Sequence, residues 1–165
     1  MRSLLSAIDA VSVYCGRAVG QFYMVAALLT FYEVVMRYLF NAPTIWAFEV
    51  VMLLCAIAWM MSAGYVTQQK KHISITILYA TAPRPARWAL DLFSNVVGLA
   101  AVGTLAYASW PLARDAWTMH ELSGSPFNSP EPMILKGMLF AGACMYALQL
   151  AVNLIRNLQT YGEWR

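Results

Sequence analysis

Three charged side chains lie where charge is rare in this chain, and their spacing could support proton or cation chemistry. Glu33 and Arg37 are four residues apart, so on a helix they share a face, with the acidic residue on the favourable N-terminal side. A short turn containing Pro43 should bring Glu49 close to both. A charge inside a bilayer has to face protein and find a partner. Two interpretations stay open: a proton or cation site, and a structural carboxylate–guanidinium–carboxylate cluster that, with Trp46, fixes two helices together or forms a subunit interface.

A second group of polar residues follows an apolar stretch directly. Lys70, Lys71 and His72 are expected to contact lipid headgroups at the cytoplasmic membrane surface, where lysines also set the topology. His120 has no neighbouring histidine or cysteine, and the three cysteines lie far apart in sequence. Neither a thiol redox centre, a haem site nor a metal site has its ligands at suitable spacing. We therefore expect no catalytic residue, no cofactor and no metal ion, and an enzyme is disfavoured.

The elements that would position these residues follow from composition. Of the 165 residues, 61% are hydrophobic and only 12% are charged, about half the charged share of a soluble domain. Uncharged runs of 20, 22 and 19 residues follow Glu49, Asp91 and Lys136, and about 20 apolar residues in a helix cross a bilayer. These features indicate a polytopic membrane protein. They exclude a disordered chain, a nucleic-acid-binding domain and a secreted disulfide scaffold.

The predicted fold is an all-α integral membrane protein with four transmembrane helices plus short interfacial helices, forming a single membrane domain over residues 1–165. The spans are placed at about 18–40, 48–66, 88–112 and 133–155. Interfacial segments are placed at about 3–15, which could instead extend the first span, and 72–82. The latter alternates like a strand, but an unpaired strand on a bilayer would leave its backbone groups unsatisfied, so a helix ending before Pro83 is favoured.

Orientation follows from the basic residues. With four spans, the termini and the 67–87 connection share one side of the membrane, which carries eight of the 11 Lys and Arg residues. Both termini of this multi-pass membrane protein are therefore predicted to be cytoplasmic. Three tryptophans would then form an aromatic belt at the outer interface: Trp46, Trp110 and Trp117.

The order of several short motifs resembles one protein family. The first is Glu33-x-x-x-Arg37-Tyr38-x-Phe40, followed by Pro43, Trp46 and Glu49. Later come Lys-Lys-His-Ile at 70–73, Trp117, Glu121, a Ser/Pro-rich loop, Lys136 and Leu148-Gln149. Each motif is weak by itself. Together, over nearly the whole chain, they resemble the small four-span membrane subunit of tripartite ATP-independent periplasmic (TRAP) transporters.

The resemblance implies a partnership, because the family imports organic acids into bacteria on a sodium gradient. A large membrane subunit carries the transport sites, and a periplasmic binding protein captures the substrate. This chain would be a scaffold that packs on and stabilises the large subunit, helps dock the binding protein and contacts membrane lipids, with no nucleic-acid partner. The alternative is a stand-alone four-span proton-coupled exporter of small molecules, which would use a free glutamate in its first span.

Overall fold

The computed structural model describes residues 2–69 and 83–162. It contains four long helices, and the described residues contain no strand. In chain order they are α1 (Arg2–Tyr38), α2 (Ala47–Gln68), α4 (Arg84–Thr118) and α5 (Glu131–Gly162). Each contains a stretch long and apolar enough to cross a membrane. The predicted all-α membrane fold with four candidate spans is therefore confirmed.

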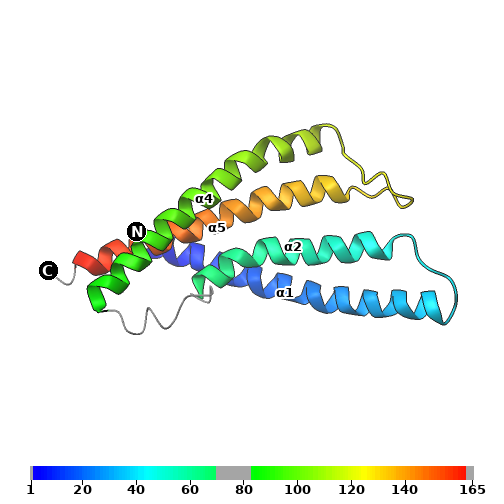
Figure 1. Ribbon diagram of the computed structural model, residues 1–165, viewed down its shortest axis with the longest axis horizontal. Coiled ribbons are helices and arrows are strands. Elements are labelled where there is room, and N and C mark those ends of the chain that lie inside the picture. The colour runs from blue at the N-terminus through cyan, green and yellow to red at the C-terminus, as the bar shows by residue number, and fades with distance from the viewer. Residues whose placement is uncertain (1, 70–82, 163–165) are drawn as a thin grey trace.

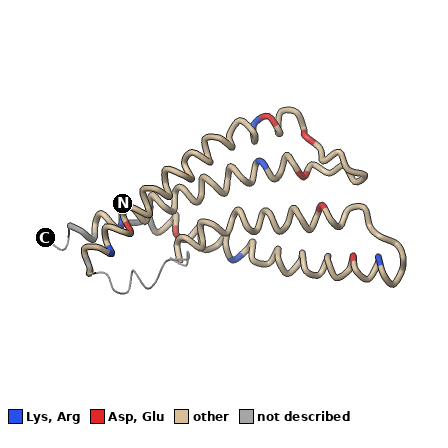
Figure 2. Tube along the Cα trace, viewed as in Figure 1, with Lys and Arg blue, Asp and Glu red and all other residues tan. Residues whose placement is uncertain are grey.

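The helices form two hairpins that lie side by side (Figure 1). α1 packs along α2, α4 packs along α5, and the hairpins meet mainly where α2 packs on α5. The α1–α2 turn and the α4–α5 loop lie at one end of the bundle, here called the loop end. Both termini lie at the other end, here called the terminal end. Charged residues gather toward these two ends (Figure 2), as expected for helices whose middle faces lipid.

All four described helices are longer than the spans expected from the sequence, and α5 continues past residue 155 to Gly162. The predicted segment 3–15 is continuous with the first span within α1, as an extension would be, and α4 continues beyond residue 112 to Thr118. A helix can continue through polar residues after its apolar stretch has ended. A span placed from hydropathy alone is therefore shorter than the helix that contains it. Where each helix enters the bilayer stays a prediction. The predicted interfacial segment 72–82 lies outside the described residues.

Left-handed residues end two of the helices at the loop end. Asn41, with φ of 50°, reverses the chain after α1. His120, with φ of 51°, follows α4, and the N–H of Glu121 donates to the carbonyl of Ala116 at 3.0 Å. This bond and the left-handed residue form a Schellman motif, which satisfies carbonyls that the helix end leaves free. Both connections can therefore turn back sharply toward the next helix.

Close packing depends on small residues. Among the residues that the structure describes, six of the ten buried apolar residues are alanines, including Ala26, Ala58 and Ala143. At Gly142 of α5, an added Cβ would lie 2.8 Å from the backbone oxygen of Met60 in α2, so only glycine permits this approach. Small residues at helix contacts are typical of membrane bundles, where dispersion and polar contacts replace the hydrophobic drive. Large apolar side chains face outward instead, among them Phe31 and Tyr107, 68% and 84% exposed.

Candidate functional site

Glu33 and Arg37 lie on one face of α1 as their spacing predicts. The Nη2 atom of Arg37 donates to Oε1 of Glu33 at 2.6 Å, and its Nε donates to the same oxygen at 3.2 Å. The other oxygen, Oε2, accepts the hydroxyl of Thr44 at 2.5 Å and its backbone N–H at 3.2 Å. Both carboxylate oxygens are therefore engaged. We call Glu33, Arg37 and Thr44 the turn cluster, because it connects the end of α1 to the turn before α2.

Trp46 lies beside the turn cluster and packs the turn onto α1. It precedes α2 directly, and its ring stacks on Tyr32 with centroids 6.2 Å apart and planes 27° apart. Offset aromatic pairs of this kind stabilise a contact beyond the area that they bury. Trp46 thus supports the same α1–α2 connection as Glu33.

Glu49 has different partners, which come from the opposite hairpin. Its Oε1 accepts hydroxyl hydrogen bonds from Ser123, at 3.2 Å, and from Ser125, and its Oε2 accepts one from Ser129. Only 6% of Glu49 is exposed. We call these four residues the loop cluster. Because the serines belong to the α4–α5 loop and Glu49 belongs to the first turn of α2, the cluster connects the two hairpins at the loop end.

The loop is shaped to present its serines. The backbone N–H of Ser123 donates to the carbonyl of Ser129 at 2.9 Å, which closes the loop on itself. The hydroxyl of Ser125 also accepts the N–H groups of Phe127 and Asn128, each at 3.1 Å. Gly124 and Asn128 have positive φ angles of 68° and 52°, a conformation that glycine and asparagine adopt readily. The loop is therefore folded around one carboxylate.

The structure divides the three-residue cluster expected from the sequence. Glu33 and Arg37 pair, whereas Glu49 binds serines, and no ion pair joins Arg37 to Glu49 among the described residues. The physical reason is that Glu49 lies on the face of α2 that meets the opposite hairpin. Whether either cluster contributes to a subunit interface stays a hypothesis. Lys70, Lys71 and His72 lie outside the described residues, and their contact with lipid headgroups stays a prediction.

A third polar group, the terminal cluster, connects α5 to α1 near the terminal end. Gln149 is fully buried; its Oε1 accepts the hydroxyl of Ser12 at 2.8 Å, and its Nε2 donates to Oδ1 of Asp9 at 2.9 Å. Arg156 forms an ion pair with the other oxygen of Asp9. An unpaired amide in this position would be costly, so the matched partners fix how α5 packs against α1.

Sequence reasoning placed Glu49 with Glu33 and Arg37 rather than with the loop serines, and it assigned no partners within the terminal cluster. The sequence did contain a signal for the terminal cluster. Gln149, Asn153 and Arg156 recur at i, i+4 and i+7, so they form a polar stripe along one face of an otherwise apolar helix. The serines of the loop carried no comparable signal, since Ser is common in loops. Within residues 2–69 and 83–162, no group of three His, Cys, Asp or Glu side chains could hold a metal ion. In the described residues, the loop and terminal clusters join helices of different hairpins, and the turn cluster joins α1 to the turn that follows it.

The sequence of this chain matches one known protein family. The sequence model described as "Tripartite ATP-independent periplasmic transporters, DctQ component" matches residues 26–160. The chain belongs to the DctQ family. The matched region covers α2 and α4, nearly all of α5 and about the last third of α1. It therefore includes the turn and loop clusters and, within the terminal cluster, Gln149 and Arg156.

A curated relative supports the same family. The "C4-dicarboxylate TRAP transporter small permease protein DctQ" of Vibrio cholerae serotype O1 is 34% identical over 83 residues. The aligned region is 50% of this chain and 36% of that relative, so it spans about a third of the relative's length. The resemblance inferred from the motifs is confirmed at the level of the family. The family's description makes it one component of tripartite transporters.

Proposed function

We propose that this protein is the small scaffold subunit of a sodium-coupled, binding-protein-dependent TRAP transporter that imports an organic acid. The observation that carries the proposal is the DctQ match over residues 26–160 of a chain whose described residues form four helices long and apolar enough to cross a membrane. Its partners would be a large membrane subunit, which performs transport, and a periplasmic substrate-binding protein. The curated relative is named for C4-dicarboxylates, which supports a small carboxylate as the substrate class.

The scaffold role is supported by how the intramembrane carboxylates are used. Glu33 is held by Arg37 and Thr44, and Glu49 is held by three serine hydroxyls. A cation-coupling carboxylate needs open coordination positions toward a pathway. In both glutamates, each carboxylate oxygen instead accepts hydrogen bonds from within the chain, which suits a rigid scaffold subunit.

The outer faces of the helices support the proposed packing on a large subunit. Large side chains such as Tyr14, Met24 and Phe31 are exposed along α1. Such faces fit either lipid or another apolar helix, and close packing against a helix adds dispersion contacts. The loop end, with its folded serine loop, is the part that we propose helps dock the binding protein.

The rival function, a stand-alone proton-coupled exporter, requires a first-span glutamate that can exchange protons with its surroundings. In α1 the glutamate has both oxygens engaged, one of them by an arginine. Both oxygens are thus occupied by contacts within the chain and are not open to a transport pathway. We therefore favour the scaffold over the exporter.

We expect substrate uptake only when all three proteins are present in liposomes with an inward sodium gradient. The reason is that a scaffold supplies no transport pathway of its own. Purified chain, large subunit and binding protein would be reconstituted singly, in pairs and together, with radiolabelled C4-dicarboxylates as the first substrates. Dissipating the sodium gradient should return uptake to the background of empty liposomes. Substantial flux through liposomes that hold this chain alone would refute the scaffold role and favour the exporter.

We further propose that the protein lies in the bacterial inner membrane with both termini in the cytoplasm. The support is the basic bias toward the terminal end. Single cysteines would replace the exposed residues Met119, at the loop end, and Gln159, at the terminal end, in a background without the native cysteines. A membrane-impermeant thiol reagent on intact cells should label Met119→Cys strongly and Gln159→Cys only after lysis. The reverse pattern would invert the topology.

A further inference from the structure

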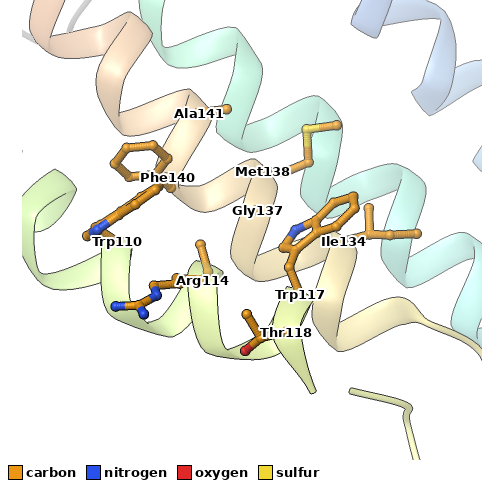
Figure 3. A pocket seen from close by; sticks show the side chains of 10 residues that line it. Trp110, Arg114, Trp117, Thr118, Ile134, Gly137, Met138, Phe140 and Ala141 are labelled. Carbon is orange, nitrogen blue, oxygen red and sulfur yellow. The ribbon is translucent and has the colours of Figure 1, made fainter. Parts of the chain in front are cut away.

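An open groove of about 470 Å³ lies between α4 and α5 near the loop end (Figure 3). Both helices line it through residues at i, i+3, i+4 and i+7, so each contributes a single face. The α4 residues are Trp110, Ala113, Arg114 and Trp117, joined by Thr118, and the α5 residues are Ile134, Gly137, Met138 and Ala141, joined by Phe140. Eight of these ten residues are apolar, and the volume lies within the range of roughly 300–1,000 Å³ typical of small-molecule sites.

Aromatic rings bound the groove at both ends. Trp110 packs against Phe140 with ring centroids 5.1 Å apart. Two helical turns further along α4, Trp117 lies over Gly137, where an added Cβ would stand 2.8 Å from the indole Nε1. Gly137 therefore leaves the space that this ring occupies. The rings are part of the wall, and the space between them stays open, as Figure 3 shows.

One positively charged residue lies at the edge of the groove, on the α4 side (Figure 3). Arg114 lies between the two tryptophans on α4. The other two basic residues of the loop end each form an ion pair: Arg37 with Glu33, and Lys136 with Glu121 at 2.5 Å. In the part of the chain that the structure describes, no carboxylate forms an ion pair with Arg114, and no carboxylate lines the groove.

We propose that this groove binds an anionic phospholipid, with the phosphate on Arg114 and an acyl chain along the apolar floor between the helices. Guanidinium groups bind phosphate through paired hydrogen bonds. The groove is carried by helices that can cross the membrane and is flanked by tryptophans, which are enriched at the headgroup level. A headgroup such as phosphatidylglycerol fits better than phosphatidylethanolamine, because the groove offers no carboxylate to an ammonium group.

The test measures lipid retention by the full-length chain purified in detergent. Phosphatidylglycerol or phosphatidylethanolamine would be titrated, and bound lipid counted by native mass spectrometry. The wild-type chain should retain phosphatidylglycerol preferentially. Arg114→Gln should weaken that retention about fivefold, the effect of one basic residue near an anionic lipid. Ala141→Leu, which adds bulk to the groove from an exposed position on α5, should weaken retention of both lipids.

Ala108→Leu is the matched control, since Ala108 is exposed and lies on the opposite face of α4. It should leave retention unchanged, and helix content by circular dichroism should be equal in all variants. Equal retention of both lipids by the wild type, or no effect of Arg114→Gln, would overturn the proposal. If Ala141→Leu left lipid retention intact but weakened copurification with the large subunit, the groove would be a protein contact instead. Because the retention assay involves neither partners nor transport, its failure would leave the scaffold function standing.

Discussion

Glu49→Ala is expected to release the α4–α5 loop from α2 and to loosen the contact between the two hairpins at the loop end. The substitution removes the acceptor of three serine hydroxyls at once. Hydrogen bonds to a charged group are among the stronger polar contacts, and at the loop end the single side chain of Glu49 accepts three that bridge the hairpins. Protease cleavage within residues 119–130 of the detergent-solubilised protein should become about tenfold faster or more, and the thermal unfolding temperature should fall.

Two further variants test whether the effect comes from the acceptor oxygens of Glu49. Glu49→Gln keeps the side-chain shape but only one acceptor oxygen, so its effect should be intermediate. Glu121→Ala removes an acid from the same loop region, but its ion pair with Lys136 is 39% exposed on the glutamate side. Exposed pairs contribute little to stability, so this variant should stay close to wild type. If Glu49→Ala were no more protease-sensitive than Glu121→Ala, the loop cluster would not be what joins the hairpins.

The second large effect is expected at the terminal cluster. Gln149→Leu should lower the free energy of unfolding by about 1–2 kcal/mol, because it removes the partner of Ser12 and one partner of Asp9 in a fully buried position. Equilibrium unfolding in mixed detergent and SDS micelles would measure the loss. The control is Gln159→Leu on the same helix, at an exposed position, where the same exchange should change stability little.

A double-mutant cycle separates the hydrogen bond from general packing. Ser12→Ala alone removes one donor to Gln149. If the bond contributes, Ser12→Ala combined with Gln149→Leu should cost less than the sum of the single variants, because the second change removes a partner that is already unpaired. Strict additivity would show that Gln149 acts through its volume alone.

Residues close in sequence could be placed without the structure. The uncharged runs after Glu49, Asp91 and Lys136 fixed three helices, and the four-residue spacing of Glu33 and Arg37 fixed their pairing. Both inferences depend on helix geometry alone, in which i and i+4 share a face and 20 apolar residues cross a bilayer. The order of motifs along the chain was enough to indicate the family.

The partners of Glu49 and Gln149 were decided only by tertiary structure. Glu49 binds serines 74 to 80 residues away, and Gln149 binds Ser12 and Asp9 at separations of 137 and 140 residues. Helical periodicity gives the face on which a residue lies but not which helix meets that face. That choice depends on how small residues such as Gly142 let α5 approach α2, and on the left-handed turns that aim the serine loop back at α2. These contacts add up over the whole bundle, so no local stretch of sequence encodes them.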